Sequence, residues 1–381
     1  MHKKRILVAV LNWGLGHATR CIPVIKELQH HNFEVFIASD GAALELLKKE
    51  FSSIKAFELP SYNISYGKTA SSFKWKLFTE TPSILNAIRL ERKKIKDLAA
   101  THHFNGIISD NRFGCRHENI TSVFITHQLS VLSGNTTYLS SKIHQNYISK
   151  FHECWIPDTP GNHNLSGVMG HLKDTPKNAK YIGPLSRFNK IPQQKKYDYA
   201  AILSGPEPQR TMLEEKLLSS FQSLDKKIIL VRGVMAENTI SSKNRNLKIK
   251  NYLTSKALQE VILSSEVIIC RSGYSSIMDL AKLEKKAFLI PTPGQYEQEY
   301  LARRFKKLEI APFCKQEDFD ISKLEDLKNF SGFSCLDFSV SFGDIFALFK
   351  GKLKFATHSK NNFHVDFLIV GFYNMFYDRK S

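Results

Sequence analysis

Short apolar runs alternate with helical patterns along the first half of the chain. The runs RILVAVL (5–11) and FEVFIASD (33–40) are predicted to be buried parallel strands. Between them, apolar residues at helical spacing predict a helix from about Thr19 to Gln29. This alternation predicts a doubly wound parallel sheet. Further strands are expected at FNGIISD (104–110), SVFITHQ (122–128) and ECWIPD (153–158).

A second series of the same kind follows a segment rich in Pro, Lys and Gln. We interpret residues 186–198 as a linker between domains at 1–185 and 199–350, with a tail of unassigned role at 351–381. Because ligands of such sheets bind outside the carboxyl ends of the strands, two Rossmann-like domains facing a cleft are expected. The strands expected in the second domain are YAAILSG (199–205), KKIILVRG (226–233), NLKIKNYL (246–253), EVIICRSG (266–273) and KAFLIPTPG (286–294).

Two apolar segments resemble targeting or membrane sequences only in part. The N-terminal run spans about seven residues and leads into a glycine turn, so a strand is expected rather than a signal peptide. The segment 363–381 is apolar for about fourteen residues and is interrupted by Asp366, which is too short and too polar for a transmembrane helix. The six cysteines form no CxxC pair, which argues against a zinc site or a disulfide framework. We expect a reduced, cytoplasmic setting.

The 381-residue chain has a net charge of +18, with more of the excess in its first half. Such a charge favours nucleic acid, an acidic membrane surface or phosphorylated ligands. No recognisable nucleic-acid-binding motif occurs, so nucleic acid is not expected as a partner. The stretch from Tyr66 to Lys96 is expected to be either a solvated helix face or a patch for an anionic membrane. Its basic and aromatic residues include Lys74, Trp75, Lys76, Arg92, Lys93 and Lys94.

The first predicted strand ends in a glycine turn that contains a histidine, Gly14-Leu15-Gly16-His17-Ala18-Thr19. The turn matches G-x-G-x-x-G only in part, because Thr19 takes the place of the third glycine. Asp40 ends the next strand, where a dinucleotide-binding fold keeps its acid for the ribose, so a nicotinamide or flavin site is an alternative. An imidazole at such a turn suits a general base, because its ordinary pKa lies near neutrality.

A second strand, turn and helix occur between residues 266 and 305. A strand is expected to end at Cys270, and a helix from Ser275 to Leu283 is expected to carry Asp279. Arg271, Ser272 and Gly273 form the turn between them. A helix N-terminus binds phosphate through its free N–H groups and its dipole. After the next strand, a polar run contains Gln295, Glu297, Gln298 and Glu299.

This region resembles the donor-binding half of the two-domain (GT-B) glycosyltransferases of family 28, the MurG-like enzymes. Those proteins carry a strand, Cys-Arg-Ser-Gly, a helix with an acid six residues after the glycine, and a later pair of glutamines. Asp279 holds the place of the acid, and Gln298 and Glu299 fall on the pair, whose second member is Glu here. The first glycine turn is similar to the family's first glycine-rich loop, with His17 on its histidine. In outline the resemblance covers residues 5–345.

The resemblance implies a site for a UDP-sugar donor. Asp279 would accept hydrogen bonds from the ribose, and Gln298 would reach the hydroxyls of the sugar. The backbone at Ser204–Gly205 would face the diphosphate beside Arg210, and the backbone at Tyr252–Leu253 would meet the uracil. The residues assigned to the donor are Ser204, Gly205, Arg210, Tyr252, Leu253, Arg271, Ser272, Gly273, Asp279, Gln295, Gln298 and Glu299.

The resemblance also implies an acceptor side in the first domain. His17 would take the proton of the attacking hydroxyl, with Asp110 as the second catalytic candidate. Asp110 and Arg112 follow one predicted strand and His127 follows another, so all three are expected to face the cleft. The residues assigned to the acceptor are Gly14, Gly16, Arg112 and His127.

No metal or cofactor is expected besides the UDP-sugar as co-substrate. The sequence contains Asp318-Phe319-Asp320, which resembles a metal-binding D-x-D but lies in a charged segment and is expected to be a solvated helix start. Helix N-termini and arginine are expected to meet the charge of the leaving UDP.

We therefore expect an inverting, metal-independent glycosyltransferase that uses a UDP-sugar, with UDP-N-acetylglucosamine as a candidate. The expected acceptor is a membrane- or lipid-linked glycan, and the expected location is cytoplasmic, with a peripheral position at the inner face of the membrane. Two other functions fit the same fold. A UDP-sugar 2-epimerase would convert the donor with no acceptor present, and a non-catalytic nucleotide-sugar-binding subunit would need a partner for catalysis.

Overall fold

The first domain is built on a seven-stranded sheet in which all neighbouring strands are parallel. The computed structural model describes residues 2–62, 70–234, 240–334 and 341–351, and only the backbone of residues 70–82. The strand order is β3-β2-β1-β4-β5-β6-β7. The strands are β1 (Arg5–Val10), β2 (Glu34–Ser39), β3 (Ala56–Glu58), β4 (Gly106–Asp110), β5 (Thr121–Ile125), β6 (Glu153–Ile156) and β7 (Ala179–Tyr181).

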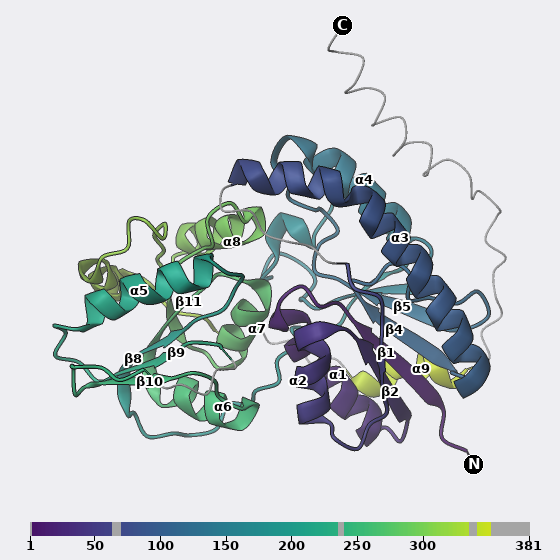
Figure 1. Cartoon of the computed structure of the whole chain (residues 1–381), viewed down its shortest axis with the longest axis horizontal. Helices are drawn as coiled ribbons and strands as arrows, with labels where there is room; N and C mark the ends of the chain where they lie inside the picture. Colours follow the sequence, from purple (N-terminus) through teal and green to yellow (C-terminus); the bar gives the residue numbers. More distant parts are fainter. Residues whose placement is uncertain (1, 63–69, 235–239, 335–340, 352–381) are drawn as a thin grey trace, which may run out of the picture.

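Helices flank this sheet, and the second domain repeats the arrangement on a smaller scale (Figure 1). The helices of the first domain are α1 (Leu15–His30), α2 (Gly41–Glu50), α3 (Ala70–His102) and α4 (Thr137–Ile148). The second sheet has the order β10-β9-β8-β11-β12 and is also parallel. Its strands are β8 (Tyr197–Ile202), β9 (Ile228–Val231), β10 (Leu247–Lys250), β11 (Ser265–Cys270) and β12 (Lys286–Leu289), and its helices are α5 (Gln209–Phe221), α6 (Ser255–Leu263), α7 (Tyr274–Lys282) and α8 (Tyr296–Lys307).

Helices cover both faces of each sheet. The central strands are therefore buried on both sides, which requires continuous apolar runs. Every residue from Ile6 to Val10 in β1 is buried, and β4 is buried along its whole length. A parallel sheet covered on both faces requires such continuous apolar strands, which is why the runs predicted the sheet correctly. The two short strands β3 and β7 were not predicted, because their residues are only partly buried and form no apolar run.

Helix α1 begins earlier than the sequence pattern predicted. It starts at Leu15 rather than near Thr19, and Gly14 caps it with a φ of 79°. Glycine adopts this left-handed conformation without the steric cost that a side chain would add. His17 therefore lies in the first turn of the helix, with its position set by the backbone.

The two sheets approach each other at equivalent points of their strand order. In both domains the strand order reverses beside the first strand, between β1 and β4 and between β8 and β11. Ligands of such sheets bind at these switch points, outside the carboxyl ends of the strands. Ser275 Oγ of α7 donates to Gly16 O of α1 over 3.0 Å, so the loops at the two switch points are in contact.

The linker and the last described helix connect the domains. No helix or strand occurs between β7 and β8, the region predicted as the linker. The last helix, α9 (Phe342–Lys350), returns to the sheet of the first domain (Figure 1), although the sequence analysis placed residues 199–350 in the second. The Phe346 ring lies 5.9 Å from the Phe33 ring and 6.1 Å from that of Trp155, measured between centroids. The apolar face of α9 is buried in this aromatic cluster, which explains the crossing.

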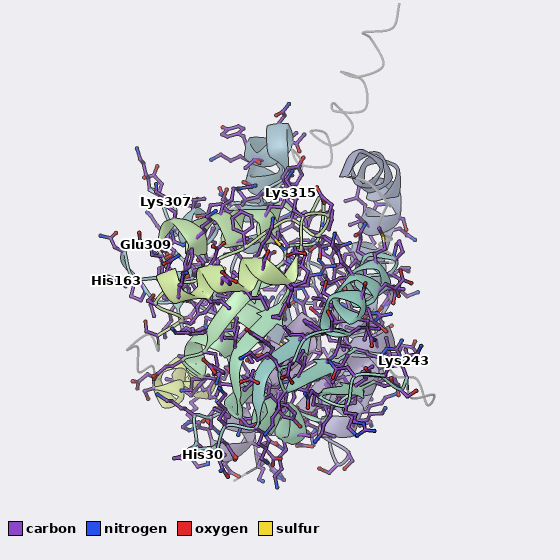
Figure 2. All side chains as sticks on the ribbon, turned by 90° about the vertical axis from the view of Figure 1, so that its left-hand side faces the viewer. His30, His163, Lys243, Lys307, Glu309 and Lys315 are labelled. Carbon is purple, nitrogen blue, oxygen red and sulfur yellow. The ribbon has the colours of Figure 1, made fainter. Side chains whose placement is uncertain are left out.

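Positive charge is spread over both domains. Arg92, Lys93 and Lys94 are exposed on α3. Figure 2 shows Lys243, Lys307 and Lys315 at separate points around the second domain, and all three are exposed. The side chains of Lys74, Trp75 and Lys76, and the tail at 363–381, lie outside the described residues. Within the described parts of the chain, no helix has the length and apolar character needed to span a bilayer.

The position of α9 predicts that Phe346→Ala destabilises the first domain. Loss of a buried phenylalanine costs about 3–5 kcal/mol. All three tryptophans precede residue 185, so tryptophan fluorescence during urea unfolding reports on the first domain. Ala347→Ser, at an exposed position of the same helix, should change the free energy of unfolding by less than about 0.5 kcal/mol. An unchanged fluorescence transition in Phe346→Ala would contradict this packing.

Candidate functional site

The first glycine turn and the end of β4 bring a histidine, an arginine and an aspartate together. His17 and Arg20 lie one turn apart on α1, and Asp110 is the last residue of the adjacent strand β4. His17 Nδ1 is 2.6 Å from Asp110 Oδ1. Arg20 donates from Nε to Asp110 Oδ2 over 2.5 Å and from Nη2 to Oδ1 over 2.6 Å. The two predicted catalytic residues are thus in contact, and Arg20 is a third member that the sequence analysis did not single out.

The charges in this cluster determine its protonation. Burial by itself would raise the pKa of Asp110, but the charges of Arg20 and His17 hold that pKa well below its ordinary value. Burial and the neighbouring charge of Arg20 lower the pKa of His17. A neutral imidazole therefore lies against an ionised carboxylate at neutral pH. This arrangement can accept a proton from a hydroxyl group, as a general base does.

His127, which follows β5, connects this cluster to the second domain. Its ring stacks on that of Tyr274, with 4.2 Å between centroids. Its Nδ1 lies 3.0 Å from Arg20 Nη1, and its Nε2 lies 3.3 Å from Glu297 Oε1. Because Tyr274 begins α7 and Glu297 lies in the first turn of α8, His127 contacts both of these helices. His127 thus lies at the contact between the domains, and its role in acceptor binding stays a prediction.

Glu297 was named in the sequence analysis only as part of a polar run. Burial by itself would raise its pKa, but His127 and the backbone N–H of Tyr274 lower that pKa to about 2. Gln128 Nε2 also donates to its carboxylate. The available signal was an acid in the first turn of a helix, which the helix dipole favours for any carboxylate. Glu299 carries the same signal, so sequence alone did not separate the two.

On the donor side, Asp279 lies on α7 beside the linker. Its Oδ1 accepts a hydrogen bond of 2.6 Å from Ser186 Oγ. Burial raises the pKa of Asp279 to about 6, although the nearby Arg187 acts in the opposite direction. Arg187 also donates to Ser255 Oγ over 3.1 Å. The acid that the resemblance assigned to ribose binding is therefore in contact with the linker between the domains.

Several predicted donor residues lie at the carboxyl edge of the second sheet. Ser204 is exposed, and Gly205 has a φ of 106°, a conformation that favours glycine. A Cβ at Gly273 would meet no atom within 4 Å, so the N-terminus of α7 is accessible. Tyr252 and Leu253 are half-buried just after β10. Donor binding at the β8–β11 switch point stays a prediction.

Arg271 has a different environment from the one that its predicted donor role suggests. Its guanidinium is buried and donates to Ile290 O (3.1 Å), Pro291 O (3.2 Å), Gln209 O (2.8 Å) and Gln316 Oε1 (2.6 Å). Burial lowers its pKa to about 10. The side chain thus joins the loop after β12, the start of α5 and Gln316 from inside the domain. Its contribution to a donor site is to hold these loops.

Arg210 is also engaged within the second domain. It donates from Nε to Glu207 over 2.6 Å and from Nη1 to the buried Glu214. Glu214 is shared with Arg232 at 2.6 Å. The positive charge that was expected to face a diphosphate is therefore compensated by carboxylates.

The predicted sugar-binding loop is held by its own side chains. Gln298 Oε1 accepts from Thr292 N over 2.8 Å, and Gln298 Nε2 donates to Gln295. Ser272 Oγ donates to the backbone oxygen of Gln298 over 2.7 Å. Glu299 Oε1 accepts from Gly294 N over 3.1 Å. A contact between Gln298 and a sugar stays a prediction, since its amide is already hydrogen-bonded.

Arg112 does not face the cleft, contrary to the sequence prediction. Its buried guanidinium pairs with Asp40 at 2.9 Å and with Glu91 at 2.6 Å. It also donates to Val10 O over 3.0 Å. Arg112 thus ties α3 to the ends of β1 and β2. Asp40, the acid of the dinucleotide alternative, is engaged in the same ion pair.

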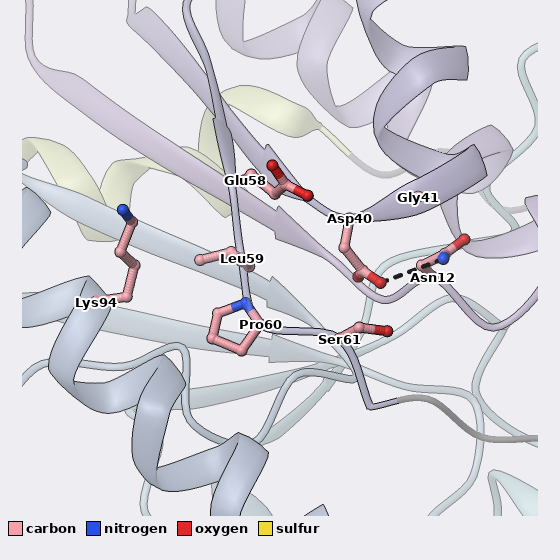
Figure 3. A pocket seen from close by; sticks show the side chains of 8 residues that line it. All are labelled: Asn12, Asp40, Gly41, Glu58, Leu59, Pro60, Ser61 and Lys94. Carbon is pink, nitrogen blue, oxygen red and sulfur yellow. Dashed lines mark hydrogen bonds between the residues drawn. The ribbon is translucent and has the colours of Figure 1, made fainter.

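A pocket of about 610 Å³ opens next to this ion pair, beside the first glycine turn. Figure 3 shows Asp40 directed at Asn12, with Lys94 of α3 on the opposite side. Asn12 Nδ2 donates to Asp40 Oδ2 over 3.3 Å. The lining residues are Asn12, Asp40, Gly41, Glu58, Leu59, Pro60, Ser61 and Lys94.

The D-x-D sequence lies away from the cluster. Asp318 and Asp320 are exposed, and Asp320 Oδ1 caps the 3₁₀ helix Ile321–Asn329 by accepting from Ser322 N over 2.9 Å. This is the solvated helix start that was expected. Among the residues that the structure describes, no three His, Cys, Asp or Glu side chains converge as metal ligands.

Comparison with known proteins agrees with this geometry. The sequence profile of the glycosyltransferase family 28 C-terminal domain matches residues 208–328. A Clostridium tetani protein is 26% identical over 343 residues, which cover 87% of this chain and 90% of the relative. That relative is a UDP-N-acetylglucosamine–N-acetylmuramyl-(pentapeptide) pyrophosphoryl-undecaprenol N-acetylglucosamine transferase. This chain is a glycosyltransferase with a family 28 C-terminal domain at residues 208–328, and over most of its length it is similar to the MurG-like relative.

Further similarities concern another relative and the fold. An uncharacterized glycosyltransferase of Methanosarcina acetivorans is 22% identical over 320 residues, covering 77% of this chain and 81% of the relative. The solved kitacinnamycin glycosyltransferase has a TM-score of 0.61 at 13% identity, covering 86% of this chain and 90% of that one. MurG of Acinetobacter baumannii has a TM-score of 0.52 at 14% identity, covering 87% and 93%. The GT-B fold expected from the sequence is confirmed.

The position of Arg271 predicts a loss of stability when its guanidinium is removed. Arg271→Met leaves the carbonyls of Ile290, Pro291 and Gln209 without their donor, which should cost the glycosyltransferase about 3 kcal/mol or more. Circular dichroism should show an earlier unfolding transition, while tryptophan fluorescence, confined to the first domain, should shift less. Arg303→Met, at an exposed position of α8, is the control. Unchanged stability with lost nucleotide affinity would instead identify Arg271 as a direct ligand of the donor.

Proposed function

We propose that this glycosyltransferase transfers a sugar from a UDP-sugar to a hydroxyl group of a lipid-linked acceptor, with inversion at the anomeric carbon and without a metal ion. The observation that carries this proposal is the contact of His17 Nδ1 with Asp110 at 2.6 Å. This pair lies at the switch point of the first sheet, and the N-terminus of α7 faces it across the cleft.

In the proposed reaction, His17 Nε2 accepts the proton of the acceptor hydroxyl as its oxygen bonds to the anomeric carbon. The bond from that carbon to the β-phosphate oxygen breaks, and UDP leaves with the electron pair. Because the hydroxyl attacks from the side opposite UDP, the configuration inverts. The imidazolium that forms is stabilised by Asp110, while backbone N–H groups near Gly205 and the N-terminus of α7 face the charge of UDP.

The donor assignment is supported by the second domain. The family 28 profile covers residues 208–328, which include α7 and the loop before α8. The name of the Clostridium relative specifies UDP-N-acetylglucosamine, so this sugar nucleotide is the first candidate donor. Asp279 is proposed to accept hydrogen bonds from the ribose in place of its present partner Ser186.

The acceptor assignment is supported by the first domain and by the same relative. That relative's acceptor is named as an N-acetylmuramyl-(pentapeptide) pyrophosphoryl-undecaprenol, in which a sugar is linked to a lipid through a pyrophosphate. The pocket of about 610 Å³ lies in the domain that carries His17, and its lining includes Asn12, two residues before the glycine turn. Arg92, Lys93 and Lys94 are exposed on α3. We propose that they meet the anionic surface of the cytoplasmic leaflet, where such an acceptor is presented.

The proposed base predicts the effect of His17→Ala. Turnover should fall by roughly 10²–10⁴-fold, because a general base contributes on this scale. UDP affinity, measured by isothermal titration, should stay nearly unchanged. The rate is measured as hydrolysis of UDP-N-acetylglucosamine or transfer from it. His30→Ala, at an exposed position near the end of the same helix, serves as the control. A loss of UDP affinity in His17→Ala would show instead that the glycine turn binds the nucleotide.

The pKa of Asp279 predicts a pH dependence of donor binding. Its carboxylate is ionised above about pH 6 and protonates below, so ribose hydroxyls lose their charged acceptor as the pH falls. Asp279→Asn should weaken UDP binding by about 1.5–3 kcal/mol at pH 8, and the difference from the wild type should shrink below pH 6. The pH dependence of UDP binding by Asp279→Asn is subtracted from that of the wild type, which removes the contribution of the titrating diphosphate. A difference that is constant from pH 5 to pH 8 would exclude this role, and Asp326→Asn, at an exposed position, is the control.

A further inference from the structure

Arg20 contacts both histidines of the first-domain site as well as Asp110. Its guanidinium is buried and lies against Asp110, His17 and His127. We propose that Arg20 is a positioning residue that holds His17 and His127 in opposite tautomers, and that His127 links it to Glu297 of the second domain. The effect on turnover rests on the proposed function, whereas the tautomers themselves do not.

The tautomer of His17 follows from the acceptor that it shares with Arg20. Arg20 Nη2 and His17 Nδ1 each lie 2.6 Å from Asp110 Oδ1 and 2.9 Å from each other. A guanidinium only donates, and an ionised carboxylate only accepts. A lone pair on Nδ1 would face the carboxylate at 2.6 Å without a proton between them. The shorter contact with the ionised carboxylate outweighs the 2.9 Å contact with Arg20 Nη2, which already donates to the same oxygen. The proton of neutral His17 therefore lies on Nδ1, and Nε2 keeps the lone pair that a base requires.

The tautomer of His127 is the reverse. Arg20 Nη1 lies 3.0 Å from His127 Nδ1, and because the guanidinium can only donate, this nitrogen must accept. The proton of neutral His127 is then on Nε2, which lies 3.3 Å from Glu297 Oε1. That nitrogen is buried, and the alignment with Glu297 falls short of a well-formed hydrogen bond.

Glu297 makes this arrangement dependent on the contact between the domains. Its carboxylate accepts from Gln128 Nε2 of the first domain and lies 3.4 Å from Tyr274 N at the start of α7. The chain from Asp110 through Arg20 and His127 therefore ends on a residue of α8. Separation of the two domains would remove the partner of His127 Nε2 and leave Arg20 as the group that determines its tautomer.

The other groups that face this chain are compatible with it. Cys21 Sγ donates to Asp110 Oδ2 over 3.3 Å, and burial keeps the pKa of this thiol well above its ordinary value, so it adds no charge. The Tyr274 ring stacks on His127 at an angle of 5° between planes and presents no polar atom to its edge nitrogens. Arg20, Asp110 and Glu297 are thus the charged groups in contact with the two histidines.

The experiment measures the tautomers directly by ¹⁵N–¹H correlation spectra of the full-length protein labelled on histidine, without substrate. Resonances are assigned with His17→Gln and His127→Gln. In the wild type, the proton should lie on Nδ1 of His17 and on Nε2 of His127. In Arg20→Lys the positive charge should preserve the His17 tautomer, while His127, which loses its planar donor, should become a mixture. Wild-type signals with the reverse assignment, or unchanged signals in Arg20→Lys, would overturn the proposal.

Glu297→Ala tests the link across the cleft, and Tyr300→Phe is its matched control. Tyr300 lies on the same helix, and its hydroxyl accepts from Val168 N of the first domain over 2.9 Å without touching either histidine. Glu297→Ala should shift the Nε2–H resonance of His127 while Arg20 keeps its tautomer, and Tyr300→Phe should leave both histidines unchanged. Equal spectra for the two variants would show that Glu297 acts only as one more contact between the domains.

A kinetic measurement tests the consequence for the base. Loss of the charge in Arg20→Gln should move the acid limb of the pH profile of donor hydrolysis upward by about one pH unit, because Arg20 lowers the pKa of His17. Arg20→Lys should restore the wild-type limb. A profile that differs only in height would assign Arg20 a merely structural role. If no UDP-sugar is hydrolysed, the proposed donor fails, but the tautomers still decide the positioning role.

Discussion

The buried ion pair between Arg20 and Asp110 is the interaction on which the candidate site depends. Two charges removed from water are stable only when hydrogen bonds satisfy their polar atoms, and removing one partner costs about 3–5 kcal/mol. Asp110 meets this requirement through Arg20, His17 and Cys21. The pair holds His17 at the mouth of the cleft, neutral and with one nitrogen directed away from the carboxylate. The chemistry proposed for this glycosyltransferase therefore rests on a structural ion pair.

The two domains meet at the switch points of their sheets. The start of α1 contacts α7, and Tyr274 OH donates across the interface to Pro157 O over 2.9 Å. Ser186 of the linker donates a hydrogen bond to Asp279, and α9, which follows the second domain, packs against the first domain. A donor bound at α7 and an acceptor bound at β4 would thus be placed by contacts that also hold the domains together.

Three buried arginines show how burial and partners assign different roles to one residue type. Arg20 faces two histidines at the cleft, Arg112 joins α3 to strand ends, and Arg271 holds the loops around the donor site. Arg112 and Arg271 were predicted to contact substrates, because each follows a strand within a recognisable motif. A motif places a residue at the carboxyl edge of a sheet, but it does not decide whether a long side chain turns toward the ligand or into the domain.

The sequence by itself determined the features that depend on local pattern. Apolar runs predicted both parallel sheets, the motif around Gly273 carried the resemblance to family 28, and the glycine turn placed His17 at a helix start. Only the tertiary structure decided the partners of these residues. Arg20 reaches Asp110 across 90 positions in the sequence, and Gln128 reaches Glu297 across 169. The physical reason is that hydrogen bonds and burial act between neighbours in space. The periodicity of a sequence does not show which side chains, distant along the chain, become such neighbours.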